Sequence, residues 1–133
     1  MSGRIMGLFA IGFCSFATVA EAQVTFHKDV EPILQAHCQH CHRPGEIGPM
    51  SLLSYADARP WARAIKAAVL TRRMPPWFAD SSVQHYKNDA ALSVSDIEKL
   101  ISWVDAGAPE GDPKDAPTPL AFVTDGTSDD LTS

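Results

Sequence analysis

The apolar side chains of this chain recur with helical spacing in three separate stretches. Within residues 29–37, 60–71 and 95–106 they stand three or four positions apart, so each stretch has one apolar face. These faces are formed by Val30, Ile33, Leu34 and His37, by Trp61, Ile65, Ala68 and Val69, and by Ile97, Leu100, Ile101 and Val104. The pattern predicts an all-α fold with three to five helices.

Residues that begin or end helices stand at the borders of these stretches. Pro32 fits the first turn of the first helix, and Pro60 fits the first position of the second. Ser54 is followed three residues later by an aspartate, and Ser95 by a glutamate, so both resemble capping boxes. The last helix is therefore predicted to start at Ser95 and to end at Gly107.

Residues 1–22 have the composition of a secretory signal peptide. Arg4 supplies a positive charge, residues 5–20 are almost wholly apolar or small, and Ala20-Glu21-Ala22 places small residues at a cleavage site. The apolar run is shorter than the roughly 20 residues that a spanning helix needs. We therefore expect cleavage between Ala22 and Gln23, export to the periplasm or otherwise out of the cytoplasm, and no stable membrane insertion.

The rest of the chain is long enough for one domain and a tail. We assign residues 23–110 to the domain, and the Pro- and Asp-rich residues 111–133 to a linker and a disordered tail. The formal net charge is −5. This charge argues against nucleic acid as a partner and favours a partner with a basic docking patch.

The strongest chemical signal is the run Cys38-Gln39-His40-Cys41-His42. Two cysteines separated by two residues and followed at once by histidine form the attachment motif of c-type haem. Each thiol adds to one vinyl group of the haem, and the histidine offers an imidazole nitrogen to the iron. The motif predicts one covalently bound haem c, held by Cys38 and Cys41, with His42 as the proximal ligand.

Two other interpretations of the motif have less support. A zinc site needs a second pair of Cys or His ligands, and downstream of the motif the chain has no cysteine and only His85. A thioredoxin-like redox pair needs a βαβ context, whereas the segment before Cys38 has a helical pattern.

A sixth ligand for the iron is predicted at Met74. The two prolines that follow it fix the backbone, which lowers the entropy lost in holding a thioether on the metal. Met50 is the main alternative, followed by His85.

Three further expectations concern the surroundings of the haem. The second ring nitrogen of His42 needs an acceptor, and we expect a backbone carbonyl of Pro44 or Pro49 to supply it. A haem propionate could pair with the guanidinium of Arg72 or Arg73. We expect the aromatic side chains of Trp77 and Phe78 to line the edge of the haem.

Residues 24–109 resemble a class I cytochrome c. The resemblance is carried by residues 25–30, 32–34, the haem motif, 43–45, 49–52, 72–77 and 103–109. More narrowly, these runs resemble a cytochrome c domain at the N-terminus of large exported bacterial redox proteins, often followed by a copper- and ascorbate-dependent monooxygenase-like region. The resemblance implies haem attachment at Cys38 and Cys41 and ligation by His42, and it supports Met74. This chain ends where such a second domain would begin.

Taken together, the sequence predicts a periplasmic monohaem cytochrome c that carries single electrons between redox protein partners. We expect a monomer and no catalysis, because no Ser-His-Asp or paired-carboxylate arrangement is evident. One alternative is a haem domain that feeds electrons to, or is truncated from, a larger oxidoreductase. Another is a haem-based sensor of gas or redox state, which requires a displaceable sixth ligand.

Overall fold

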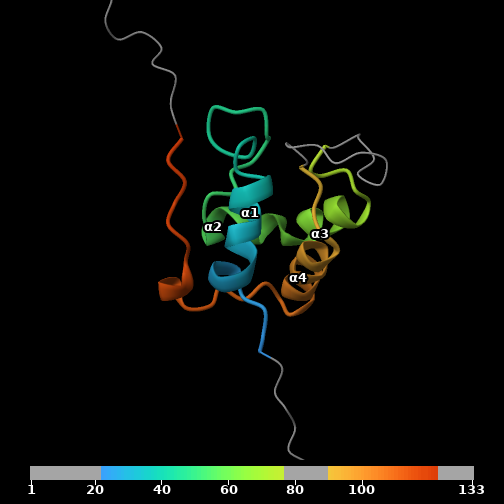
Figure 1. The fold of residues 1–133 in the computed structure, drawn as a ribbon, viewed down its shortest axis with the longest axis vertical. Helices are drawn as coiled ribbons and strands as arrows, with labels where there is room; N and C mark the ends of the chain where they lie inside the picture. The colour runs from blue at the N-terminus through green and yellow to red at the C-terminus, as the bar shows by residue number, and fades with distance from the viewer. Residues whose placement is uncertain (1–21, 77–89, 123–133) are drawn as a thin grey trace, which may run out of the picture.

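The computed structural model describes residues 22–76 and 90–122. Every regular element within these ranges is helical, so the prediction of an all-α chain is confirmed (Figure 1). The α-helices are α1 (Glu31–His37), α2 (Tyr55–Ala58), α3 (Ala62–Leu70) and α4 (Val94–Asp105). A π-helical turn η1 (Phe26–Val30) and two 3-10 turns, η2 (Arg59–Trp61) and η3 (Pro113–Asp115), complete the set. No helix of the described residues is long and apolar enough to cross a membrane.

The first helical segment begins earlier than the apolar pattern indicates. The turn η1 starts at Phe26 and runs directly into α1. The backbone carbonyl of Thr25, just before the turn, accepts hydrogen bonds from the amides of Asp29 and Val30, at 3.1 and 3.3 Å. The Asp29 carboxylate accepts in return from the Thr25 amide at 2.8 Å, which caps the turn. This local cap adds a turn to the helix that brings Cys38 to the site.

The second predicted helix is divided into the 3-10 turn η2 and the helix α3, and the short helix α2 precedes both. The hydroxyl of Ser54 accepts from the amide of Asp57 at 3.2 Å, so the predicted cap of α2 is confirmed. Pro60 lies within the 3-10 turn η2, and α3 begins two residues later than predicted, at Ala62. A proline is tolerated in such a turn because its missing amide hydrogen is not needed there.

The start of α4 is a correction to the sequence-based prediction. The cap is Ser93, whose hydroxyl accepts from the amide of Asp96 at 3.1 Å, and not Ser95, which lies inside the helix. The predicted end is confirmed, because Gly107 has a φ of +86°. Glycine adopts this left-handed conformation without steric strain.

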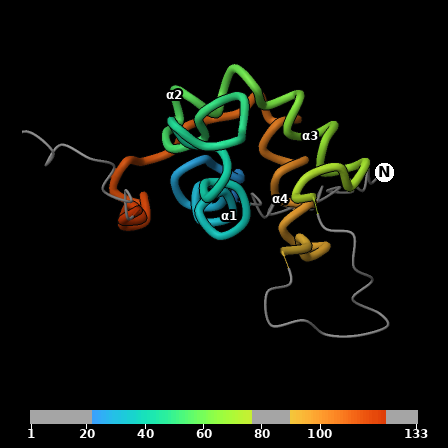
Figure 2. The backbone as a smooth tube through the Cα atoms, turned by 90° about the horizontal axis from the view of Figure 1, so that it is seen from above, coloured from blue at the N-terminus to red at the C-terminus, as the bar shows by residue number. Residues whose placement is uncertain are grey.

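The hydrophobic core packs η1, at the start of the domain, against α4 near its end. Its largest fully buried side chains are Trp103, Phe26, Leu34, Leu100 and Val30. The indole N–H of Trp103 and the amide of Phe26 both donate to the carbonyl of Pro109, at 2.9 and 3.0 Å. Figure 2 shows α3 and α4 side by side, and they pack directly against each other.

The residues after 110 lie against the helical body as far as the structure describes them. The amide nitrogen of the Gln35 side chain donates to the carbonyl of Thr118 at 3.2 Å, which places this segment along α1 (Figure 1). Further on, the Phe122 ring lies 4.1 Å from the guanidinium carbon of Arg43. The predicted boundary at residue 110 stays a prediction, and so do the signal peptide and the end of the tail, which lie outside the described residues.

Candidate haem-binding site

The helix α1 ends where the Cys-x-x-Cys-His motif begins. The chain turns tightly there, because the amides of Cys41 and His42 both donate to the carbonyl of Cys38, at 3.1 and 2.9 Å. Cys38 is half-buried and Cys41 is exposed, and neither forms a disulfide. The turn therefore brings Cys38 and His42 to the wall of one cavity.

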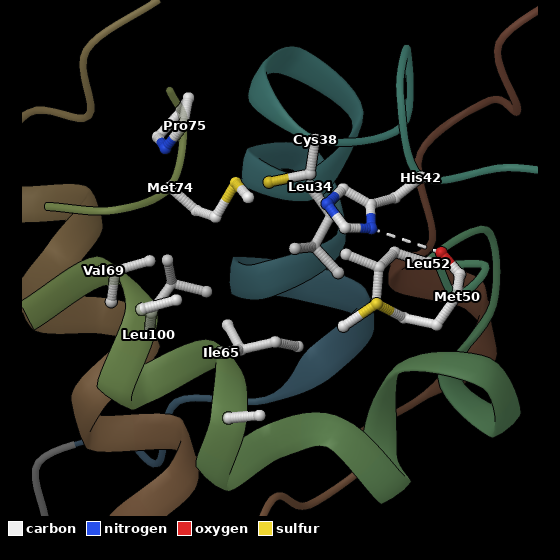
Figure 3. A pocket seen from close by; sticks show the side chains of 12 residues that line it. Leu34, Cys38, His42, Met50, Leu52, Ile65, Val69, Met74, Pro75 and Leu100 are labelled. Carbon is white, nitrogen blue, oxygen red and sulfur yellow. Dashed lines mark hydrogen bonds between the residues drawn. The ribbon is translucent and has the colours of Figure 1, made fainter. Parts of the chain in front are cut away.

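The ring of His42 is held by one hydrogen bond. Its Nδ1 lies 3.2 Å from the backbone carbonyl oxygen of Met50. Because a carbonyl only accepts, Nδ1 carries the proton and Nε2 keeps its lone pair. Figure 3 shows Nε2 turned away from Met50 and toward the cavity. The prediction of a carbonyl acceptor from this loop is right in kind but wrong in residue, since neither Pro44 nor Pro49 supplies it.

Gly48 allows the loop to pass close against this imidazole. A Cβ at this position would lie 2.7 Å from Nδ1 of His42 and 2.5 Å from the carbonyl oxygen of Cys41. The amide of Gly48 also donates to that carbonyl at 2.8 Å. Only a residue without a side chain fits here, a requirement that the sequence pattern does not mark.

Gln39 is a second residue of the site that the sequence did not single out. Its side chain is only 2% exposed, and its amide nitrogen donates to the carbonyl of Leu52 at 3.0 Å. The amide of Leu52 donates in turn to the carbonyl of His42 at 2.9 Å. These two bonds tie the motif to the far end of the loop. Nothing in the spacing of the motif marks the first of its two intervening residues as structural.

The motif opens onto two adjoining hollows with almost entirely apolar walls. Figure 3 shows the residues that line the first of them. The volumes of the two hollows are about 450 and about 630 Å³. Both are lined by Cys38, His42, Met74 and Pro75. The inner one is closed by aliphatic side chains of the helices, namely Leu34, Leu52, Ile65, Val69 and Leu100.

Met74 and Met50 occupy different sides of the cavity. Met74 lines both hollows, and in Figure 3 its side chain lies across the cavity from His42. Met50 lies on the His42 side, where its own carbonyl holds the imidazole. A ligand opposite the proximal histidine must come from the other side of the iron, so the arrangement favours Met74. The third candidate, His85, lies outside the described residues, as do Trp77 and Phe78.

Burial controls the ionisation of one of the two thiols. Desolvation, with a smaller contribution from the neighbouring Cys41, raises the pKa of Cys38 to about 12 from its usual 9.0. Cys38 is therefore a neutral thiol at physiological pH.

The two arginines expected to pair with propionates are exposed at the end of α3. Arg72 has a φ of +53°, and the Arg73 Nε donates to the hydroxyl of Thr71 at 3.3 Å. Their pairing with a propionate stays a prediction.

The donor set and the cavity together fit haem c. Two thiols, one free imidazole nitrogen and one thioether sulfur face a space with apolar walls, as covalent attachment and axial ligation require. Within the described ranges, no three His, Cys, Asp or Glu side chains are arranged to hold a metal ion by themselves.

Comparisons with known proteins identify no relative. No protein-family model matches the chain, and neither a curated protein nor a solved structure gives a significant match.

Proposed function

We propose that this chain is an exported c-type cytochrome with one haem, and that it transfers single electrons between redox partners. One observation carries the proposal: Cys38, His42 and Met74 line the same apolar cavity, while Nδ1 of His42 is already held by a carbonyl 3.2 Å away. An imidazole fixed in this tautomer is prepared to bind a metal through Nε2. Cys41, one turn after Cys38, lines the outer hollow.

Each residue has a distinct part in this proposal. Cys38 and Cys41 would hold the haem by two thioether bonds, and His42 and Met74 would supply the ligands of its iron. The Met50 carbonyl fixes the orientation of the His42 ring and increases its basicity. When bound, haem c supplies a one-electron change between Fe(III) and Fe(II).

The surroundings favour electron transfer over catalysis. If His42 and Met74 both bind the iron, they would leave no open coordination position for a substrate or for oxygen. The apolar walls would offer few polar groups that rearrange between the two oxidation states. A thioether ligand favours Fe(II), so we expect a higher reduction potential than two histidine ligands would give.

The experiment is optical spectroscopy of the full chain, exported to a bacterial periplasm with the haem-attachment system present. A pyridine haemochrome spectrum counts the haems and shows whether both vinyl groups have reacted. We expect one haem with two thioether bonds, and a near-infrared methionine–iron band in the oxidised protein.

Paired variants identify the sixth ligand. Met74→Ala is expected to abolish the near-infrared band and to lower the potential, whereas Met50→Ala keeps the band, because the carbonyl that holds His42 belongs to the backbone. Loss of the band in Met50→Ala alone would reverse the assignment. Absence of covalent haem in the wild-type protein would refute the proposal.

A further inference from the structure

A second hollow lies on the other side of α3 from the haem cavity. It is an open groove of about 790 Å³ between the start of α3 and the end of α4, with equal shares of polar and apolar wall. Its lining consists of Arg59, Pro60, Ala62, Arg63, Val104, Gly107 and Ala108. Two other residues of α3, Ala64 and Ala68, line the haem cavity instead. The groove and the cavity are therefore separate sites on one helix.

The two arginines of the groove have no partner among the described residues. Arg59 and Arg63 are both exposed, and they stand one helical turn apart. Other basic side chains nearby are engaged: Lys66 pairs with Asp105 across α3 and α4, and Arg43 pairs with Glu46 at 2.6 Å. The groove thus presents two free guanidinium groups side by side.

Their position is unfavourable for the isolated chain. Like charges one turn apart repel each other, and the beginning of a helix carries the positive end of its dipole. Residues 59–73 contain five basic residues and no acidic one, although the whole chain has a net charge of −5. A bound anion would relieve this repulsion. The local charge is therefore complementary to an acidic ligand, in contrast to the basic partner that the net charge suggests.

The shape and the walls of the groove indicate which acidic ligand fits. Guanidinium groups bind carboxylates through two parallel hydrogen bonds. Two of them, one turn apart, match two carboxylates on one segment better than a single small anion. The apolar floor of Pro60, Val104 and Ala108 can pack against the methylene groups of acidic side chains.

We propose that this groove binds an acidic segment of a partner protein, through the carboxylates of two of its side chains. The proposal does not rest on the haem. Binding here leaves the mouth of the haem cavity, on the other side of α3, uncovered.

The test is a titration of the ¹⁵N-labelled full chain, as exported, with a capped hexaglutamate peptide at low ionic strength. We expect the amide resonances of Ala62, Val104 and Ala108 to shift most. The double variant Arg59→Gln, Arg63→Gln is expected to bind the peptide about tenfold more weakly. The matched control, Lys99→Gln, removes an exposed charge of α4 outside the groove and is expected to keep the affinity within twofold.

Four outcomes would overturn the proposal. These are no binding of hexaglutamate, equal weakening by Lys99→Gln, largest shifts in the loop after the haem motif, and equal shifts with inorganic phosphate, which would make the groove a site for small anions. A charge-reversed variant, Arg59→Glu with Arg63→Glu, must bind hexalysine in place of hexaglutamate. Circular dichroism verifies that each variant is folded. Because the readout does not involve haem, a negative result leaves the electron-transfer proposal standing.

Discussion

The imidazole Nδ1 of His42 lies 3.2 Å from the carbonyl oxygen of Met50, eight residues further along the chain. The loop between the two residues makes this approach possible, and Gly48 is the point where it passes closest to the ring. The orientation of the proximal ligand is thus determined by a backbone path and not by a second side chain. A substitution of the Met50 side chain leaves the backbone carbonyl of residue 50 in place. A change in the path of the loop between His42 and Met50 moves that carbonyl.

Gly48→Ala is therefore expected to disturb His42 more than any change of the Met50 side chain. The added methyl group would meet the Cys41 carbonyl and the imidazole at 2.5 and 2.7 Å, so the loop must move away. Overpacking of this kind costs about 1–3 kcal/mol. We expect a lower thermal midpoint and a shifted reduction potential in the haem-loaded protein.

The control for this change is Val94→Ala, which removes an apolar side chain that lines neither hollow. Val94 is 66% exposed, so its truncation is expected to leave the midpoint and the potential nearly unchanged. Equal behaviour of the two variants would show that the close approach of Gly48 to His42 does not matter.

Ser93→Ala is expected to destabilise the protein, and Ser95→Ala is not. Ser93 caps α4 through its bond to the amide of Asp96, and loss of an N-cap costs about 0.5–2 kcal/mol. Ser95 is exposed within the helix, where alanine is the better helix former. Urea unfolding of the two variants measures the difference. A larger loss of stability for Ser95→Ala would place the cap where the sequence pattern predicts it.

The haem-free chain is expected to lose stability as the pH rises from about 9 to about 12. In this range the unfolded chain releases the Cys38 proton, whereas the folded chain, in which burial raises the pKa of Cys38 to about 12, retains it. The unfolded state then binds fewer protons, so the free energy of unfolding falls, by up to about 1.4 kcal/mol per pH unit. The contribution is fully present below pH 9.

The measurement is urea unfolding of the haem-free mature chain at a series of pH values, against Cys38→Ala. The variant shares every other titrating group. The difference between the two proteins in the slope of unfolding free energy against pH is therefore due to Cys38. Attachment of haem consumes the thiol and is expected to remove the same difference. Equal slopes of unfolding free energy against pH for the haem-free wild type and the haem-free Cys38→Ala variant would contradict the raised pKa of Cys38.

The exported protein is expected to begin at Gln23 and to carry the mass of one haem. Small residues at Ala20 and Ala22 set the cleavage site, and two thioether bonds keep the haem attached under denaturing conditions. Intact-protein mass spectrometry measures both features at once. Detection of a haem-bearing chain that still contains residues 1–22 would show that this segment is kept as an anchor and is not cleaved as a signal peptide.

Features set by near neighbours in the chain could be predicted from the sequence. The spacing of Cys38, Cys41 and His42, the cap at Ser54 and the end of α4 at Gly107 each depend on a few consecutive residues. The cap of α4 shows the limit of this reasoning. Ser93 and Ser95 are both followed three residues later by an acidic residue. Local chemistry alone does not separate them, and burial of Leu92, just before Ser93, accompanies the earlier start.

Features that depend on the path of a loop could not be predicted. The acceptor for His42 is the carbonyl of Met50, and every residue has a carbonyl, so the sequence carries no mark of it. The burial of Gln39 likewise depends on where the chain returns, at Leu52. The side of the cavity on which Met50 and Met74 lie depends on how α3 packs against α4 and α4 against η1, and not on the spacing of the two methionines.

The shared carbonyl of Pro109, which accepts from Phe26 and from Trp103, has a consequence for biosynthesis. If the chain is exported from its N-terminus, as proposed, residues 26–42 emerge well before residue 109. Until Pro109 has emerged, Phe26 and Trp103 lack the carbonyl to which both donate, and η1 cannot pack against α4. If haem is attached as proposed, both thiols are therefore accessible to it while the polypeptide is still being translocated.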